Sequence, residues 1–279
     1  GVMMSGVRTI LTESMIEWIN DNSMVSNSII KAPYLVTSFD KISDFCISFY
    51  NRNDEWDLDC QDFIMLLFVG SLPRNHDSYH NTIFCVSDNP RDLFSYLMDQ
   101  SVMRYGTWAS AKKLSYISKS ATIHPSAFVY DGVYISDGVE VGSNSSIGNP
   151  GFGFGRLNGE AYRLVHNGGV VIEQDTKIGS NSTVVSGTFK PTTLGRGVLI
   201  DVHVHVAHNC NVGDYSTLTA GAIMSGSVTL EGQNWLGPNS CVVNSTTLGK
   251  ETFVGIGAVV TKSFNSGTIA GNPAKRLRG

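Results

Sequence analysis

The carboxyl-terminal half of the chain repeats an apolar position every six residues. The period runs from Leu194 to Val260 without a break, and earlier through 123–147 and 172–184. A small or aliphatic residue often stands two positions before each apolar residue, and glycine often follows it. Alternate residues of a strand face the same side, so each hexad predicts a short strand with two inward side chains and a turn. Three hexads would close one triangular coil of about eighteen residues, with strands of stacked coils paired in parallel.

Hexapeptide repeats of this kind resemble those of the left-handed parallel β-helix. The hand comes from that resemblance, since the period alone does not fix it and most crossovers are right-handed. Two interruptions break the period, one between Ile147 and Ile172 and one between Val184 and Leu194. Inserted residues cannot enter a narrow prism, so we expect both segments to bulge outward and to form binding surface.

Residues 1–115 lack the sixfold period. Short apolar runs at 45–50, 63–69 and 82–86 alternate with helix-like segments, and 87–100 offers Asp88 or Asn89 as the N-cap and Pro90 in the first turn. The predicted fold is therefore mainly β, a left-handed parallel β-helix preceded by a small α/β domain. We expect 1–115 to recognise nucleotide or sugar, 116–264 to be the catalytic β-helix, and 265–279 to be a basic tail.

Composition narrows the class of protein. Charged residues are 16% of the 279 residues and glycines number 29, which favours a turn-rich β protein. The net charge of −4 gives no electrostatic basis for binding nucleic acid. Five scattered cysteines without a CxxC pair suggest neither a disulfide framework nor a zinc ribbon. No apolar run of 18 residues and no signal peptide is recognisable, so we expect a cytoplasmic protein without membrane insertion.

The segment DVHVHVAHNCNVG, residues 201–213, holds three of the seven histidines. Val204 and Val206 fall on inward positions, which predicts that His203 and His205 project outward on one strand and that His208 lies at a corner. A coil of about eighteen residues places Gly226 beside His208. An imidazole next to a bare backbone N–H could accept a proton from a nucleophile while the amide binds a developing oxyanion.

Two other interpretations of these histidines stay open. They could be ordinary surface positions of a β-helix. They could also bind zinc, as histidines do between subunits of γ-class carbonic anhydrases, which share this helix. His203 and His205 share a face too cramped for a tetrahedral set, and no partner histidine falls on a neighbouring repeat, so we predict no metal site.

Several segments resemble the UDP-3-O-acylglucosamine N-acyltransferases of lipid A biosynthesis. IDVHVHVAHNCNVGDYSTLTAGAIMSGS resembles the catalytic stretch of that family. NPGFGF at 149–154 with RLVHNGGVVI at 163–172 resembles the family's Gly-Phe-Gly-aromatic insertion and the strand after it, and TFKPTTLGRGVLID resembles the segment that follows these. VTSFDKISDFCISFY is similar to its amino-terminal domain. The similarity covers about residues 33–260.

The resemblance implies a homotrimer that moves an acyl group from a carrier-protein thioester to a sugar amine, at sites between subunits. It implies that His208 is the general base, Asp201 its orienting partner and the Gly226 amide the oxyanion donor. It also implies that Phe49 stacks on a nucleobase, with Trp56 as a further candidate in YNRNDEW. The other ligand contacts that we expect are Phe152, Phe154, His166 and His205.

The chain departs from that family in three places. Val185-Ser186 replaces an Asp-Arg pair, Thr246 replaces a histidine, and the ending GNPAKRLRG resembles coenzyme A-dependent hexapeptide acetyltransferases. Lys275 and Arg276 are therefore candidate partners for coenzyme A phosphates.

We predict an N-acyltransferase acting on a nucleotide-linked amino sugar, for cell-surface polysaccharide or lipid A-type synthesis. Acyl-CoA or acyl carrier protein would be the co-substrate, and no cofactor would be permanently bound. The alternatives are a sugar O-acetyltransferase that uses acetyl-CoA, and a nucleotide-sugar-binding β-helix without turnover.

Overall fold

A computed structural model describes residues 8–10, 13–26, 29, 33–36, 46–50, 65–74, 76–103, 108–109 and 115–278. The chain divides into two compact units, one of residues 1–111 with 152–165 and the other of residues 112–151 with 166–279. The segment 152–165, which interrupts the repeat, thus belongs to the first unit and not to the β-helix. Within the described residues, no helix is long and apolar enough to cross a membrane.

The first unit is built on a seven-stranded mixed sheet in the order β2-β6-β5-β4-β3-β1-β7. Strands β3, β4, β5 and β6 pair in parallel, whereas β2, β1 and β7 pair antiparallel with their neighbours. The bounds are β1 (Arg8–Ile10), β2 (Met24–Val25), β3 (Pro33–Val36), β4 (Cys46–Tyr50), β5 (Met65–Val69), β6 (Thr82–Val86) and β7 (Trp108–Ala109). All five residues of β5 are buried, as expected for a central parallel strand.

Helices α1 (Glu13–Asn22) and α2 (Pro90–Met103) complete this unit. Pro90 is the first residue of α2, and the carbonyl of Asn89 accepts the first helical bond from Leu93, so Asn89 is the N-cap. The ring of Phe94 packs against Phe49 of β4 and Phe68 of β5, at centroid distances of 5.2 and 5.9 Å. The small α/β domain predicted from the apolar runs is confirmed.

A two-stranded hairpin, β14 (Phe154–Leu157) and β15 (Glu160–Arg163), contacts α2. Its attachment is polar and aromatic. The Tyr162 hydroxyl donates to Asp92 and the Tyr96 hydroxyl donates to Glu160, both at 2.7 Å. Burial, followed by the adjacent Asp92 carboxylate, raises the pKa of Tyr162, so its hydroxyl stays protonated and remains a donor.

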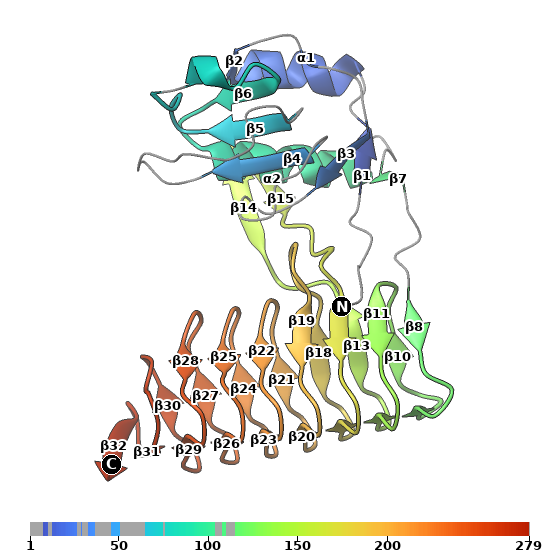
Figure 1. The fold of residues 1–279 in the computed structure, drawn as a ribbon, viewed down its shortest axis with the longest axis vertical. Helices are drawn as coiled ribbons and strands as arrows, with labels where there is room; N and C mark the ends of the chain where they lie inside the picture. Colours follow the sequence, from blue (N-terminus) through green and yellow to red (C-terminus); the bar gives the residue numbers. More distant parts are fainter. Residues whose placement is uncertain are drawn as a thin grey trace. The chain divides into compact units, whose positions relative to one another are not determined.

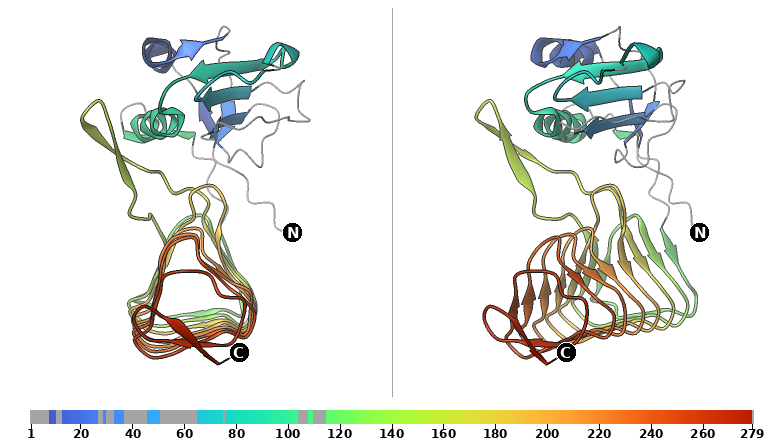
Figure 2. Two further views of the ribbon diagram at one scale, coloured as in Figure 1. Left: turned by 90° about the vertical axis from the view of Figure 1, so that its left-hand side faces the viewer. Right: turned by 60° about the vertical axis from the view of Figure 1, so that its left-hand side comes forward.

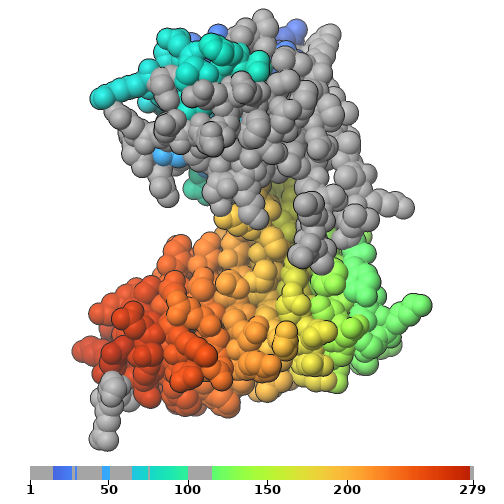
Figure 3. Space-filling model, viewed as in Figure 1, coloured from blue at the N-terminus to red at the C-terminus, as the bar shows by residue number. Residues whose placement is uncertain are grey.

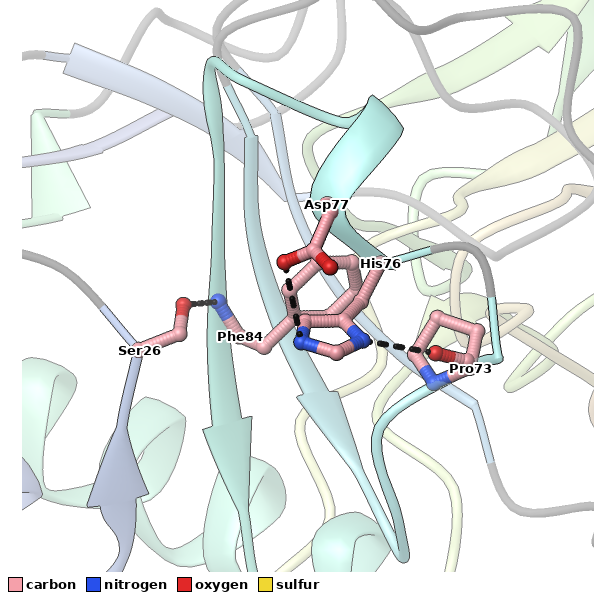
Figure 4. A network of polar contacts seen from close by, with 5 residues as sticks. All are labelled: Ser26, Pro73, His76, Asp77 and Phe84. Atoms are coloured by element: carbon pink, nitrogen blue, oxygen red, sulfur yellow. Dashed lines mark hydrogen bonds and ion pairs between the residues drawn. The ribbon is translucent and has the colours of Figure 1, made fainter.

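The edge of the first unit's sheet carries a small polar network (Figure 4). The backbone N–H of Phe84 donates to the Ser26 hydroxyl at 2.9 Å, and the N–H of Ser26 donates back to the Phe84 carbonyl at 2.9 Å. Nearby, in a 3-10 turn at His76–Ser78, Nδ1 of His76 lies 3.0 Å from the Pro73 carbonyl and Nε2 lies 3.3 Å from an Asp77 oxygen. These contacts fix the end of β2 on β6 and the turn at 73–78.

The second unit is a parallel β-helix with a triangular cross-section (Figures 1 and 2). Its first sheet contains β8 (Tyr116–Ile117), β11 (Val133–Ile135), β16 (Val170–Ile172), β19 (Thr192–Leu194), β22 (Asn211–Val212), β25 (Thr229–Leu230) and β28 (Thr247–Leu248). The second contains β9 (Thr122–Ile123), β12 (Glu140–Val141), β17 (Lys177–Ile178), β20 (Leu199–Ile200), β23 (Thr217–Leu218), β26 (Trp235–Leu236), β29 (Phe253–Val254), β31 (Thr268–Ala270) and β32 (Lys275–Arg278). The third contains β10 (Phe128–Val129), β13 (Ser146–Asn149), β18 (Thr183–Val185), β21 (His205–Val206), β24 (Ile223–Met224), β27 (Cys241–Val242) and β30 (Val259–Val260).

The register of these strands confirms the coil length. Val206 pairs with Met224, eighteen residues later, and the same offset recurs between Leu218 and Leu236. Coils therefore stack in sequence order, as the unbroken colour gradient from green to red shows (Figure 3). The apolar position of each hexad faces a continuous buried core. The predicted mainly β fold with a hexapeptide β-helix is confirmed.

The carboxyl-terminal residues close this core and are not a free tail. After β31, strand β32 turns back antiparallel to it, and Ala274 between them is buried against the last coil. The backbone N–H of Ala274 donates to the Val259 carbonyl at 2.7 Å. Solenoids need such a terminal cap, because their last coil would otherwise expose its apolar interior.

Candidate active site

Both interruptions of the repeat and His208 lie along one edge of the prism. This histidine edge joins the third sheet to the first, and consists of residues 150–151, 166–169, 186–191, 207–210 and 225–228. The period explains why these segments lie together, since each of them connects a strand of the third sheet to a strand of the first sheet, one coil after another. Two outward segments and a histidine therefore meet on neighbouring coils.

His208 lies against Gly226, as the coil length predicts. A Cβ built on Gly226 would be 2.5 Å from Cε1 and 2.7 Å from Nε2 of His208. Glycine is therefore needed here for space rather than for an unusual backbone conformation. Within the part of the chain that the structure describes, the Gly226 N–H donates to no acceptor, while its carbonyl accepts from Ser245. An imidazole and an available amide donor lie side by side.

Asn209 sets the orientation of that imidazole. Its Oδ1 lies 3.0 Å from Nδ1 of His208 and accepts from the N–H and the hydroxyl of Thr188, at 3.2 and 2.8 Å. Its Nδ2 donates to the Lys190 carbonyl at 3.4 Å. The Thr188 N–H can only donate and the Lys190 carbonyl can only accept, so these two groups fix which end of the amide faces His208. Nδ1 must then carry the proton, which leaves Nε2 as the basic nitrogen beside Gly226.

A second histidine lies next to the first. His166, in the segment that returns from the hairpin, is only 6% exposed. Its ring centroid is 5.1 Å from that of His208, with the rings inclined by 61°. The two insertions thus both reach His208, one through Thr188 and one through His166.

His205 points outward from β21, as predicted, and is half-buried. Burial, followed by repulsion from a charged His208, lowers the pKa of His205. His203 differs from the prediction, because it precedes the strand in a turn with φ of +58°. Asn144, Asn181 and Asn239 hold the same turn position in other coils with positive φ, so His203 has a turn role there. Among the described residues, no group of three metal-ligating side chains could hold an ion.

Asp201 does not contact His208 in this chain. It lies between β20 and β21, on the edge that joins the second sheet to the third, so the whole strand β21 separates it from the histidine edge. Its carboxylate accepts from the backbone N–H groups of Val202 and Ala220, at 2.8 and 3.2 Å. Asp201 stabilises a turn, and Asn209, rather than the expected Asp201, is the partner of the His208 imidazole.

The expected aromatic contacts fall in the first unit. Phe49 is half-buried and packs on Phe94 of α2, and Trp56 lies outside the described residues. Phe152 is 88% exposed and Phe154 is 53% exposed, with their ring centroids 4.9 Å apart. The Arg163 guanidinium lies over the Phe154 ring, 5.6 Å from its centroid. Exposed aromatic rings with a cation at hand are available for a ligand.

Lys275 and Arg276 are exposed on β32. That strand extends the second sheet, which is the face of the prism opposite the histidine edge. One guanidinium nitrogen of Arg276 donates to the Ser266 carbonyl at 2.6 Å. Within one chain these cations therefore lie on another side of the coil from His208.

Cys210 follows the site but has no nucleophilic character. It is buried, and burial raises the pKa of its thiol to about 12. Its Sγ lies 3.2 Å from the Ser225 carbonyl. Because the thiol stays protonated at neutral pH, a covalent acyl-cysteine intermediate is not favoured here.

Sequence reasoning missed Asn209 and Thr188. The sequence contained an indication of both residues, because the four extra residues between Val184 and Leu194 had to pack on the coil that carries His208. It also did not anticipate that His166 would contact His208 directly. The two histidines are 42 positions apart in the chain, and the six-residue period does not relate the segment after the hairpin to the turn that carries His208.

Known proteins match part of this chain. The UDP-3-O-acylglucosamine N-acyltransferase of Leptospira biflexa is 44% identical over 87 residues, which are 31% of this chain and 25% of that protein. The enzyme of that name from Sulfurimonas denitrificans is 37% identical over 131 residues, 46% of this chain and 41% of that protein. The aligned stretches thus span less than half the length of each relative. No protein-family profile matches the chain.

Two solved structures are also similar. The UDP-N-acetylglucosamine acyltransferase of Bacteroides fragilis is 18% identical, with coverage of 58% of this chain and 71% of that chain and a TM-score of 0.49. A mutant of perosamine N-acetyltransferase from Caulobacter crescentus, in complex with CoA and GDP-perosamine, is 19% identical, with coverage of 78% and 71% and a TM-score of 0.24. On the sequence matches, the aligned part of this chain is homologous to UDP-3-O-acylglucosamine N-acyltransferases.

Proposed function

We propose that this protein is an N-acyltransferase, which moves an acyl group from a thioester to the amino group of a nucleotide-linked sugar. The single observation that carries the proposal is the pairing of His208, with Nε2 unprotonated, and the open amide of Gly226. The sequence identity to UDP-3-O-acylglucosamine N-acyltransferases supports the reaction class.

In the proposed reaction, Nε2 of His208 takes a proton from the sugar nitrogen as that nitrogen attacks the thioester carbonyl carbon. The Gly226 N–H donates to the carbonyl oxygen as it gains negative charge. When the intermediate collapses, the C–S bond breaks and His208 returns the proton to the leaving sulfur. General base catalysis contributes roughly 10²–10⁴-fold and an oxyanion donor about 10²–10³-fold.

We propose that the first unit binds the nucleotide and sugar. Phe49 and Trp56 are candidates to stack on the base, and Phe152, Phe154 and His205 are candidate ligand contacts. Exposed aromatic faces with Arg163 alongside suit a planar, anionic ligand. The donor is acyl-CoA or acyl carrier protein, with Lys275 and Arg276 as candidate partners of CoA phosphates.

A direct test measures thiol release and product mass with a panel of nucleotide amino sugars and acyl thioesters. We expect His208→Ala to lower kcat by about 10²–10⁴-fold. Gly226→Ala should lower kcat by about a hundredfold, because the new methyl group displaces the imidazole from its place beside the amide. Asn244→Ala is the matched control, since Asn244 is exposed on the same edge one coil beyond Gly226. Full activity of His208→Ala would refute the catalytic role.

The same assay separates the two donors. Lys275→Ala combined with Arg276→Ala should raise the KM for acyl-CoA and leave carrier-protein use unchanged. Equal effects on both donors, or none on acyl-CoA, would remove these residues from donor binding.

The same pair of groups could deprotonate a sugar hydroxyl, which would make the enzyme an O-acetyltransferase. Product stability distinguishes the two reactions, because hydroxylamine cleaves an ester readily and leaves an amide intact. A chain that binds nucleotide sugar but releases no thiol with any donor would be a binding module.

A further inference from the structure

A second imidazole beside His208 has no part in the mechanism proposed above. His166 is nearly fully buried, and its ring meets that of His208 in an edge-to-face arrangement at 5.1 Å. Planar aromatic rings prefer this geometry to a face-to-face stack. The contact therefore restrains the ring of His208.

The backbone of His166 is tied firmly to the coil that precedes His208. The Ser186 hydroxyl lies 3.2 Å from the His166 carbonyl and accepts from the Gly169 N–H at 3.0 Å. Main-chain bonds join the two insertions, from Asn167 to Thr188 at 2.9 Å and from Gly168 to Gly187 at 2.7 Å. The position of His166 is thus set by the same segment that positions Asn209.

Bare backbone lies against both rings. A Cβ on Gly151 would be 2.5 Å from Nε2 of His166, and a Cβ on Gly226 would be 2.5 Å from Cε1 of His208. Ser186, which holds the His166 backbone, belongs to the coil before His208, whereas Gly226 belongs to the coil after it. The imidazole of His208 is consequently held between His166 on one side and Gly226 on the other.

His205 from β21 lies near this pair, and 225–228 contributes no titratable group. Like charges at short distances oppose one another. Burial and His208 also lower the pKa of His205.

We propose that His166 is a positioning residue for acyl transfer, whose buried imidazole holds the ring of His208 beside the Gly226 amide. This inference rests on the proposed function of the site. It assigns His166 a role through His208, in place of the direct ligand contact expected from the sequence.

The test compares His166→Ala, which removes the ring, with His166→Phe, which keeps a ring but cannot titrate. We expect His166→Ala to lower kcat by about 10–100-fold, as a misplaced catalytic group does, with donor KM changed less than about threefold. His166→Phe should restore most of kcat and leave the acidic limb of the pH profile in place. His124→Ala is the control, because His124 is exposed on a different edge. An unchanged His166→Ala enzyme, or a His166→Phe enzyme as impaired as His166→Ala, would overturn the proposal.

A second measurement does not need activity. In ¹⁵N-histidine NMR spectra of the whole chain, assigned with a His208→Asn variant, the wild type should show His208 as one neutral tautomer with the proton on Nδ1. In His166→Ala, the His208 signals should move toward averaged tautomers. His208 signals that His166→Ala leaves unchanged would refute the inference. A wild type that transfers no acyl group but keeps these signals would defeat only the proposed function.

Discussion

At the scale of single residues, Asn209 decides which nitrogen of His208 can accept a proton. Its amide is held at both ends by the segment 186–191, so the fixed orientation of Asn209 passes to the imidazole. An amide partner orients the ring without adding charge. A carboxylate would orient it equally and would also stabilise the protonated form.

Substitutions of Asn209 test this relation. Asn209 has φ of +61°, so Asn209→Gly removes the side chain without backbone strain. We expect Asn209→Gly to lower kcat by about tenfold, the typical loss when a functional side chain loses the hydrogen bond that orients it. Asn209→Asp should keep the orientation and move the acidic limb of kcat/KM to higher pH, because a nearby carboxylate raises the pKa of the imidazole.

The measurement is a pH–rate profile for each variant. Ser227→Gly is the control, since Ser227 is exposed and has the same backbone conformation one coil later. A downward shift of the limb in Asn209→Asp, or full activity of Asn209→Gly, would contradict the assigned role.

At this scale the sequence correctly predicted that His208 and Gly226 are neighbours, because a period of eighteen residues relates them directly. The expected orienting partner was Asp201, whereas in the structure Asn209 contacts Nδ1 of His208. Asp201 and His208 are seven positions apart, but strand β21 lies between them and places them on different edges of the prism. The two residues are therefore close in sequence and not in contact.

At the scale of elements, the hairpin formed by β14 and β15 interrupts the sequence of the β-helix but belongs to the first unit. It departs from the β-helix after Gly151 and packs on α2 through two tyrosine–carboxylate hydrogen bonds. Its aromatic residues therefore belong to the unit proposed to bind the nucleotide sugar. The residue that returns to the β-helix is His166, which contacts His208.

Removing one of these hydroxyl groups tests the attachment. Tyr162→Phe should destabilise the docked hairpin by about 1 kcal/mol, the usual net value of one hydrogen bond. Amide exchange in 154–163 should then be faster, while exchange in the β-helix strands stays the same. Tyr215→Phe, at an exposed tyrosine of the β-helix, provides the comparison. Unchanged exchange in 154–163 would show that the hydroxyl does not hold the hairpin.

At the scale of the whole molecule, the third sheet offers a surface for self-association. Ile223 of β24 is 41% exposed, and Cys241 and Val259 occupy the same outward position on the next two strands. Cys241 and Val259 are half-buried, so this row is apolar but only partly exposed. Apolar rows on a rigid, flat face are typical of a subunit interface. We propose that the protein forms a homotrimer through this flank.

Sedimentation equilibrium should then give a mass of about three times 30.2 kDa. Ile223→Lys should shift the mass toward that of the monomer, because a charge on an apolar interface is costly. Asn211→Lys, at an exposed polar position of the first sheet, should leave the mass unchanged. A wild-type protein that sediments as a monomer at the concentration where it transfers acyl groups would remove the trimer from the proposal.

The sequence by itself determined everything that depends on periodicity. The six-residue period specified the coil, the inward face of each strand and the stacking of Gly226 on His208, because hydrophobic burial enforces the same register in every coil. Local signals were also sufficient for α2, whose start at Pro90 follows from the proline and the cap.

Only the tertiary structure decided what the interruptions do. The segments 150–169 and 186–191 do not follow the six-residue period. The contacts of His166 with His208, of Thr188 with Asn209 and of the hairpin with α2 therefore arise from packing between segments that are far apart in the chain. The partner of Nδ1, the second imidazole and the unit to which the hairpin belongs are all of this kind. Each depends on which hydrogen-bond partners a segment outside the repeat finds in the folded chain, and the spacing of residues in the sequence does not specify those partners.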